Sequence, residues 1–480
     1  MMEYHGIILA GSSPRVAGRT LGGPRLRTAA KRAGFDLLIA DYVYNLTQDE
    51  IFELLKKNVT SKTKVLGFSH TWYEPGLYDI HWAGDPFLEK IKKTWPHVLI
   101  VTGNQINKVL VKSDYHFYGM ADYSFVEFLK KIHDQPSNVF IQKPIGSHPY
   151  IIDSNTSNPI TNMDDTDTEF IIEDDVHPHD TMPLEISRGC IFTCAFCRYP
   201  FQGKKSFEFI RSPENVAREI RNNYELFGIT RYNIMDSTFN DTILKLELLK
   251  KALEIAKLPK FEFCCFIKPE MIATKGNDMI PKLIDMGLVG AFMGIESLDN
   301  QSRKAMNKGM DINRILDASY KLVEDSKHKI KICASMIVGL SNDTPDMMYK
   351  TQEFFVKEQD KLFTHWLFTA LDIRLHNKAE FIYTLSDMEK DPEKFGYELS
   401  KGGYWKNKHM DYTLAKKIAQ ELKAMDSKVC RPGGWAVPMA WFLNKSEEEM
   451  LTIPTGSYWN DYTSAMVADS RRRYELAMTR

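Results

Sequence analysis

The segment Ser187-Arg188-Gly189-Cys190-Ile191-Phe192-Thr193-Cys194-Ala195-Phe196-Cys197 places three cysteines in a C-x3-C-x2-C pattern. It continues an apolar run, 182–187, that predicts a β-strand. Three thiolates are one ligand short of a closed site on a four-iron cluster, so one iron stays open to a small chelating molecule. Cys190, Cys194 and Cys197 are therefore the predicted metal ligands and catalytic residues.

The spacing, the Arg188-Gly189 pair and the aromatic Phe196 resemble the signature of the radical S-adenosylmethionine (SAM) superfamily. The resemblance implies a [4Fe-4S] cluster whose open iron is chelated by the amino and carboxylate groups of SAM. It also implies cleavage of SAM to a 5′-deoxyadenosyl radical, with a reductant such as flavodoxin or ferredoxin. The alternative is a structural zinc site in which His177 or His179 joins the three cysteines.

Strand-like and helix-like runs alternate from 182 to 373, as in parallel βα units. The predicted strands are 182–187, 232–236, 261–267, 289–294, 330–338 and 365–373, with helices such as 213–227, 244–256 and 345–358. Six such units make an incomplete (β/α)6 barrel, placed at 181–375. Chemistry in barrels lies at the carboxyl ends of the strands.

Two strand ends carry polar residues at positions where the family binds SAM. Asp236-Ser237 follows the second strand, where the family has a short motif for the SAM ammonium group. The commonest version of that motif is Gly-Gly-Glu, so the sequence departs from it here. Gly294-Ile295-Glu296-Ser297 closes the fourth strand and resembles the family's GIES segment. Glu296 would then face the ribose or the methionine end of SAM.

The fifth strand resembles the family's G-x-I-x-G-x-x-E pattern. Ile337 and Gly339 match it, whereas Ser335 and Asn342 replace its first glycine and its glutamate. The resemblance implies that the backbone here packs on the adenine of SAM, so Ser335, Ile337 and Gly339 are predicted to bind SAM, together with Phe196.

Residues 1–150 show a second βα alternation, with strands expected at 5–10, 37–41, 65–69, 98–101 and 115–117. Five strands, each followed by a helix, predict a doubly wound, Rossmann-like sheet. This layout resembles the cobalamin-binding domain that precedes the barrel in many radical SAM methyltransferases. The alternative is a vestigial domain that contacts substrate or a partner.

The resemblance assigns cobalamin contacts to three loops of this front domain. The predicted residues are Ser69, Thr71, Thr102, Gly103, Asn104 and Gly119. Asn104 replaces the second glycine of the family's Gly-Gly turn, and the loop 11–23 contains no histidine. His81 lies in a D-x-H-x-x-G match, 79–84, but after the third strand rather than the first. We interpret that match as coincidental, so the lower axial position of cobalt would be vacant or hold water.

The remaining segments are a predicted linker and a predicted helical cover. Residues 151–180 are acidic and rich in Asp, Asn and Thr, which is typical of a solvated linker. Residues 376–480 predict a mostly helical region, and the resemblance implies that this region covers the substrate. Trp405, His409 and Trp441 there either line a cavity or pack the helices on the barrel.

The whole chain has 480 residues, 43% of them hydrophobic, with 62 basic and 63 acidic side chains. This balance gives no global field that favours nucleic acid or a membrane surface. The four cysteines outside the triplet show no clustered spacing and are expected to be buried structural thiols. No apolar run reaches the length of a membrane span, and a cytoplasmic, reducing setting is expected.

The leading hypothesis is a cobalamin-dependent radical SAM enzyme that methylates an unactivated carbon. A second is a radical SAM oxidation or rearrangement with a cobalamin-free front domain, and a third is a zinc-stabilised binding protein. Methylthiolation of tRNA fits poorly, because that family carries three further cysteines in its front domain and no cysteine precedes Cys190. Small-molecule, peptide and nucleotide substrates stay open, as does the oligomeric state.

Overall fold

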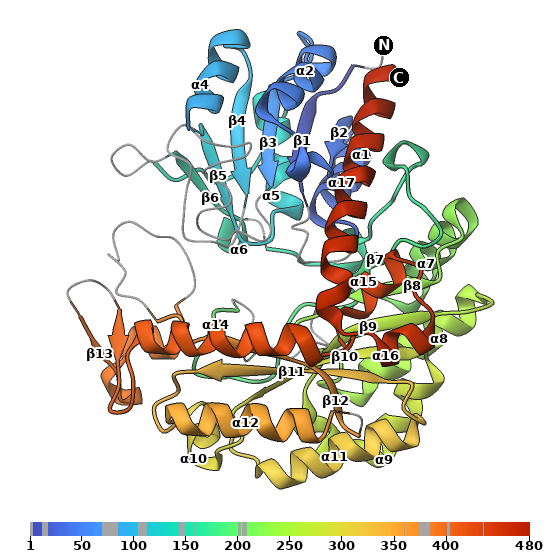
Figure 1. The fold of residues 1–480 in the computed structure, drawn as a ribbon. Coiled ribbons are helices and arrows are strands. Elements are labelled where there is room, and N and C mark those ends of the chain that lie inside the picture. Colours follow the sequence, from blue (N-terminus) through green and yellow to red (C-terminus); the bar gives the residue numbers. More distant parts are fainter. Residues whose placement is uncertain are drawn as a thin grey trace. The chain divides into compact units, whose positions relative to one another are not determined.

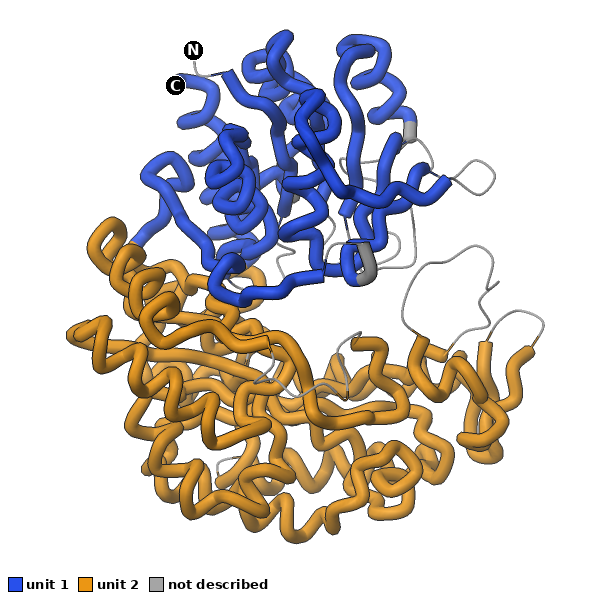
Figure 2. The backbone as a smooth tube through the Cα atoms, turned by 180° about the vertical axis from the view of Figure 1, so that it is seen from behind, with its two compact units in different colours: residues 1–177, 378–383, 463–480 blue, residues 178–377, 384–462 orange. Residues whose placement is uncertain are grey.

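The computed structural model describes the chain except residues 1–2, 12–17, 70–84, 104–112, 144–148, 158, 200–202, 204–208, 360, 374–384, 401–403 and 435. The chain forms two compact units (Figure 2). Unit 1 comprises residues 1–177, 378–383 and 463–480, and unit 2 comprises residues 178–377 and 384–462. Within the described ranges, every helix is too short or too polar to cross a bilayer.

Unit 1 contains a six-stranded, wholly parallel sheet in the order β2-β1-β3-β4-β5-β6 (Figure 1). Its strands are β1 (Gly6–Ala10), β2 (Leu37–Ala40), β3 (Val65–Ser69), β4 (Leu99–Gly103), β5 (Tyr115–Tyr118) and β6 (Tyr150–Asp153). The five predicted strands and the doubly wound fold are confirmed, and β6 is an additional strand.

Alternate residues of β1 point to opposite faces of this sheet, as the pleat of a strand requires. Ile7 and Leu9 pack with α2 (Gln48–Asn58) and α4 (Asp85–Thr94). Ile8 packs on the other face with α1 (Gly22–Arg32) and α5 (Asp122–Ile132). Both faces are therefore covered, which explains why the strands read as continuous apolar runs.

The predicted solvated linker is wrong, because the structure includes residues 151–177 in unit 1. They contain β6, the short helix α6 (Ser154–Ser157) and the 3-10 turns η2 (Met163–Thr166) and η3 (Ile172–Asp174). Met163 and Phe170 are buried. Arg27 donates two hydrogen bonds of 2.6 Å to the buried carboxylate of Asp174. Asp174, one of the acidic residues that suggested solvation, is instead the partner of a buried arginine.

Unit 2 contains the predicted six-stranded parallel sheet, in the order β12-β11-β10-β9-β8-β7. Its strands are β7 (Met182–Leu184), β8 (Arg231–Ile234), β9 (Glu262–Ile267), β10 (Leu288–Glu296), β11 (Lys331–Val338) and β12 (Phe363–Ala370). The intervening helices are α7 (Pro213–Phe227), α8 (Ile243–Ala256), α9 (Pro269–Asp285), α10 (Asn300–Ala305), α11 (Ile312–Asp325) and α12 (Pro345–Lys357). Strands neighbouring in sequence are neighbours in the sheet, which is the order of a partial barrel.

Local sequence signals set the ends of the helices that were predicted. Ser212 caps α7 by accepting a hydrogen bond from the Asn215 amide, Pro213 is the first helical residue, and Gly228 ends the helix at φ 72°. Thr344 and Pro345 begin α12 in the same way. Capping hydroxyls and an N-terminal proline satisfy or remove amides that a helix leaves unpaired.

The C-terminal region of unit 2 contains α13 (Asp387–Lys390), the 3-10 turn η5 (Glu393–Phe395), β13 (Glu398–Leu399), β14 (Trp405–Lys406), α14 (Tyr412–Val429), α15 (Ala436–Phe442) and α16 (Glu447–Thr452). Trp405 and Trp441 are 1% and 2% exposed. Trp441 packs with Cys264 and Val437 in a small core. These two aromatic side chains therefore pack helices and strands together, as the alternative interpretation predicted.

The last helix, α17 (Thr455–Thr479), contributes its residues from 463 onward to unit 1. Arg473 is buried there and pairs with Asp41, and its guanidinium lies 4.7 Å from the centre of the Tyr42 ring. Burial raises the pKa of Asp41, but Arg473 and then Arg19 outweigh it and hold that pKa at about 2. The end of the chain is thus an integral part of the front unit, which the predicted boundary at 376 did not anticipate.

Substituting Arg473→Met should lower the free energy of unfolding by about 3–5 kcal/mol, because it leaves Asp41 buried without its main partner. Urea denaturation followed by circular dichroism measures the loss. Arg471→Met is the matched control on the same helix: the pair of Arg471 with Glu50 is partly exposed and its loss should cost about 1 kcal/mol or less. Equal losses in the two variants would contradict the buried role of Arg473.

Candidate active site at the carboxyl ends of the barrel strands

The three cysteines of the triplet lie in the loop that follows β7, and each is half-buried with a free thiol. Gly189 turns the chain into this loop at φ 130°, a conformation that favours glycine. Within the loop, the Cys197 amide donates a 3.0 Å hydrogen bond to the carbonyl of Cys194. Burial raises the pKa of the Cys197 thiol to about 11, so nearby positive charge is needed before it can act as a thiolate ligand.

Two other segments of unit 2 fix the cysteine loop in place. The Ala195 amide donates to the carbonyl of Met306, and the Ala195 carbonyl accepts from the amide of Met388, at 3.1 and 3.0 Å. Arg198 donates to the buried carboxylate of Glu389 at 2.8 and 2.5 Å. The loop is therefore held by the end of α10 and by α13.

A buried lysine stands beside the middle cysteine. Lys268 follows β9, and its Nζ lies 3.5 Å from the Sγ of Cys194 and 4.3 Å from the centre of the Phe192 ring. Burial, and next the ammonium of Lys308, lower the pKa of Lys268, whereas Glu270 and the thiols of Cys194 and Cys190 act in the opposite direction.

Glu296 ends β10 with a backbone φ of 69°, which is uncommon for a residue other than glycine. Its Oε1 lies 3.4 Å from the Nζ of Lys308, and its Oε2 accepts a 3.4 Å hydrogen bond from Ser335 on β11. Arg303 donates to the carbonyl of Ile295 and pairs with Glu270 at 2.9 Å. The structure thus brings together the predicted residues Glu296 and Ser335 and adds Lys308 to them.

Asp236, predicted to hold the SAM ammonium, is engaged with the protein itself. It accepts hydrogen bonds from the amides of Ile186 and Ser187 and from the Ser187 hydroxyl, at 2.8, 3.1 and 2.7 Å. Lys245 lies 3.3 Å from its other side, and burial raises the pKa of Asp236. This carboxylate joins the ends of β7 and β8 directly ahead of the cysteines, while its neighbour Ser237 is exposed.

The Gly339 end of β11 is covered by the C-terminal region. Gly339 has φ 109°, and a Cβ there would lie 2.3 Å from the ring of Trp405. Its carbonyl accepts 3.1 Å hydrogen bonds from Tyr397 and Asn407. Packing therefore requires glycine at this position. The other predicted residues are less constrained: Ile337 is buried beside it, and Phe196 is half-buried in the cysteine loop.

Asp343 follows the Asn342 that replaces the glutamate of the family pattern. It is fully buried, and its Oδ1 accepts hydrogen bonds of 3.0 and 2.5 Å from Ser297 and Ser302. The carboxylate thereby connects the loop after β11 to the segment that follows Glu296. Burial raises the pKa of Asp343 to about 7.

Sequence reasoning missed Lys268, Arg303, Lys308 and Asp343. Lys268 directly follows a predicted strand. The rule that functional residues lie at the carboxyl ends of the strands, which indicated Asp236 and Glu296, could therefore have indicated Lys268 as well. Arg303 and Lys308 lie on α10 or just beyond it, where only the folded chain shows that they return to the strand ends.

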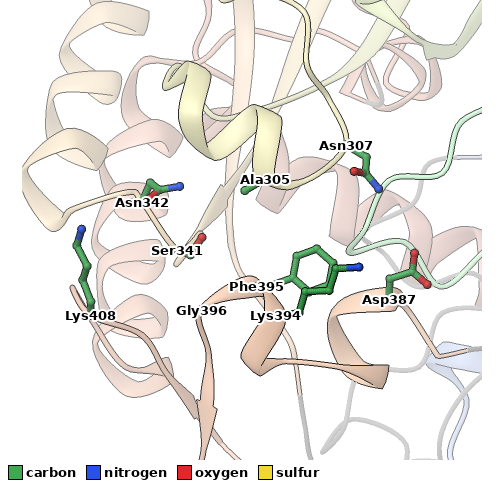
Figure 3. A pocket seen from close by; sticks show the side chains of 9 residues that line it. All are labelled: Ala305, Asn307, Ser341, Asn342, Asp387, Lys394, Phe395, Gly396 and Lys408. Carbon is green, nitrogen blue, oxygen red and sulfur yellow. The ribbon is translucent and has the colours of Figure 1, made fainter.

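A pocket of about 530 Å³ lies in unit 2 (Figure 3). Its walls come from the end of α10, the loop after β11 and the segment 387–408. Asn307 in this wall donates a 3.1 Å hydrogen bond to the carbonyl of Thr193, next to Cys194. None of the predicted SAM-binding residues lines this pocket.

The zinc alternative would require a fourth ligand close to the triplet. Among the described residues, no three His, Cys, Asp or Glu side chains are gathered closely enough to hold one ion. His179 packs edge-on against Phe442, and His177 lies 3.7 Å from Asp175 in unit 1. Thiols that bind separate irons of one cluster need not meet at a single point, so the loop fits a cluster better than one zinc ion.

In unit 1, two of the predicted cobalamin residues lie side by side at the carboxyl edge of the sheet. Ser69 at the end of β3 is in register with Gly103 at the end of β4. A Cβ on Gly103 would lie 3.9 Å from the Cβ of Phe117, which is an ordinary contact, so packing against the described residues does not require glycine here. Gly119 follows β5 at φ 87°, and a Cβ there would meet Asn155 at 2.5 Å.

The other predicted cobalamin residues are engaged or lie outside the described part of the chain. Thr102 is buried, and its hydroxyl lies 2.9 Å from Nδ1 of His116, whose pKa burial lowers to about 4. Thr71, Asn104 and the coincidental match at His81 are outside the described residues. So are the loops 12–17 and 70–84, which follow β1 and β3 at the point where the strand order reverses and ligands of such sheets bind.

Residues 184–355 match the family model of the radical SAM superfamily. This match covers most of the six-stranded sheet of unit 2 together with the cysteine loop.

Three curated relatives are similar to parts of the chain. A hopanoid C-2 methylase of Rhodopseudomonas palustris is 26% identical over 191 residues, which are 39% of this chain and 35% of that protein. A bacteriochlorophyllide d C-12(1)-methyltransferase of Chlorobaculum tepidum is 27% identical over 214 residues, 42% and 43% of the two chains. A Methanocaldococcus jannaschii protein named for methylthio transfer is 26% identical over 288 residues, 50% and 62%. The chain thus spans about a third to three fifths of the length of these relatives.

Two solved structures share the fold. The radical SAM methyltransferase TsrM of Kitasatospora setae superimposes with a TM-score of 0.63 at 12% identity, covering 98% of this chain and 99% of that one. The cobalamin-dependent radical SAM enzyme OxsB gives a TM-score of 0.55 at 15% identity, covering 82% of this chain and 56% of that one. These likenesses confirm the fold of both units.

The buried carboxyl of Asp343 should make stability depend on pH. An unfolded aspartate ionises near pH 4, whereas Asp343 keeps its proton up to about pH 7. The unfolded state therefore binds fewer protons in this interval, and stability falls as the pH rises from about 4 to about 7. Asp343→Asn should reduce that fall by ~2–4 kcal/mol, measured as urea midpoints at pH 5 and pH 8.

Asp346→Asn is the matched control for this measurement, because Asp346 is exposed three residues further along the chain. It should keep the pH dependence of the unaltered protein. If Asp343→Asn also kept it, the buried carboxyl would not be the titrating group.

Proposed function

We propose that the chain is a cobalamin-dependent radical SAM enzyme that methylates an unactivated carbon. The observation that carries the proposal is the cysteine loop: three half-buried thiols, fixed by α10 and α13, beside the buried charged groups of Lys268, Glu296 and Lys308. The family match over 184–355 and the named activities of the two methylating relatives support it.

In this proposal Cys190, Cys194 and Cys197 hold a [4Fe-4S] cluster and leave one iron for SAM. When bound, that cluster supplies the single electron that cleaves SAM to a carbon radical. Glu296 and Ser335 offer an acceptor and a hydroxyl at one end of the SAM site, and Lys308 offers a cation for a carboxylate. Asp236 positions the loop by joining β7 to β8, and the apolar strands behind these residues exclude water.

Ser69 and Gly103 support cobalamin as the methyl carrier of unit 1. They end the adjacent strands β3 and β4 with little side-chain bulk, at the edge where ligands of such sheets bind. Gly119 belongs to the same predicted set, but Asn155 fills the space beside it. Thr71, Thr102 and Asn104 belong to the same predicted loops. Bound methylcobalamin would supply the methyl group.

A one-electron donor such as flavodoxin or ferredoxin completes the proposed reaction, in a reducing cytoplasmic setting that keeps thiols and clusters intact. Burial raises the pKa of Cys264 and Cys265 well above the ordinary value, and Cys333 and Cys430 are buried as well. These four thiols lie in the core, whereas the three thiols of the triplet are half-buried in one loop, which makes the triplet the proposed ligand set.

Methylthio transfer, for which one relative is named, has less support. Enzymes of the family that performs this reaction carry three further cysteines in the front domain. No cysteine precedes Cys190 in this chain. The remaining alternative is a radical SAM oxidation or rearrangement without cobalamin, and the following experiment distinguishes it from methylation.

Anaerobic reconstitution with iron, sulfide, cobalamin and SAM, followed by mass analysis of the nucleosides, tests the proposal. We expect 5′-deoxyadenosine, together with S-adenosylhomocysteine whose formation depends on cobalamin. Cys194→Ala should abolish 5′-deoxyadenosine by removing a cluster ligand, and Cys265→Ala, a buried thiol outside the site, should keep it. 5′-Deoxyadenosine without S-adenosylhomocysteine would refute methyl transfer, and zinc in place of iron and sulfide would refute the cluster.

A further inference from the structure

Lys268 directs a positive charge at a cysteine of the triplet. Its Nζ lies 3.5 Å from the Sγ of Cys194, and the residue is only 8% exposed. The carboxylate oxygen of Glu270 is slightly further away, at 3.7 Å. The nearest partner of this ammonium is therefore a thiol of the loop.

The position of the ammonium is fixed at both ends of the side chain. The Lys268 amide donates a 2.7 Å hydrogen bond to Oδ1 of Asn240, and the Lys268 carbonyl accepts a 3.0 Å hydrogen bond from Nδ2 of the same residue. At the other end, the ammonium lies 4.3 Å from the centre of the Phe192 ring, within the range of a cation–π interaction. The charge cannot swing away into solvent without breaking these contacts.

Lys268 differs from the other two cations near the loop, because it has no carboxylate of its own. Lys308 pairs with Glu296 at 3.4 Å, and Arg303 pairs with Glu270 at 2.9 Å. These two pairs are neutral overall. Lys268 is the third cation and shares Glu270 with Arg303, so a net positive charge remains next to Cys194.

We propose that Lys268 raises the reduction potential of the cluster held by the triplet. Reduction adds one electron, from an external one-electron donor, and breaks no bond in the protein. A fixed positive charge in a poorly hydrated site stabilises the reduced cluster more than the oxidised one, because the reduced cluster carries one more negative charge. Lys268 thus acts through the thiolate of Cys194 and tunes the cluster, an inference that rests on the proposed function.

Potentiometric titration of the reconstituted cluster, followed by electron paramagnetic resonance of the reduced state, tests this inference without any substrate. Lys268→Met should reduce the equilibrium constant for reduction of the cluster at least tenfold. This corresponds to a midpoint potential lower by about 59 mV for a one-electron couple. Lys268→Arg should keep most of the unaltered value, and Lys268→Glu should lower the midpoint further. The order of midpoints should follow the charge at position 268.

Lys275→Met is the matched control, because Lys275 is an exposed lysine on α9, the helix that begins directly after Lys268. The midpoint of this variant should not move. Glu270→Gln removes the nearby negative charge and should raise the midpoint, so it decides the question even if Lys268→Met fails to hold iron. A midpoint unmoved in Glu270→Gln, or one that moves equally in Lys268→Met and Lys275→Met, would overturn the inference. Failure of the unaltered chain to bind a cluster at all would instead overturn the proposed function.

Discussion

The balance of charge in a half-buried loop is the constraint on which the proposed site depends. Three thiolates cannot be held close together away from bulk water unless cations compensate them. In unit 2, Lys268, Lys308 and Arg303 stand at the strand ends, with Glu270 and Glu296 between them. These residues come from the ends of β9 and β10, from the first turn of α9, and from α10 and the residues just after it, and Lys268 reaches Cys194 in the cysteine loop.

The loop itself is positioned by contacts that carry no redox chemistry. Asp236 joins the ends of β7 and β8 directly before the cysteines, and the Ala195 backbone is held by Met306 and Met388. A residue first interpreted as a ligand of SAM thus has a positioning role in the folded chain. Gly339 is a second such residue. It was predicted to bind SAM, but Trp405 and Tyr397 contact it in the folded chain.

Much of this architecture could be predicted, because periodic apolar runs and capping residues act locally. All six strands of unit 2 follow from such runs, and α7 begins and ends where Pro213 and Gly228 indicate. The failures concern contacts between residues far apart in sequence. The composition of the acidic segment before β7 predicted a solvated linker, but Asp174 in that segment pairs with Arg27. The last part of α17 belongs to unit 1, where Arg473 pairs with Asp41. A local pattern carries no information about such partners.

The central claim is that the protein ligates three corners of an iron–sulfur cluster and leaves the fourth for SAM. Electron–nuclear double resonance of the reduced protein with SAM labelled at its amino nitrogen tests it most directly. We predict a hyperfine coupling between the cluster and that nitrogen. The coupling should be absent from a control sample prepared without SAM. A reduced cluster that shows no coupling to labelled SAM, with a protein side chain bound to every iron, would contradict the account.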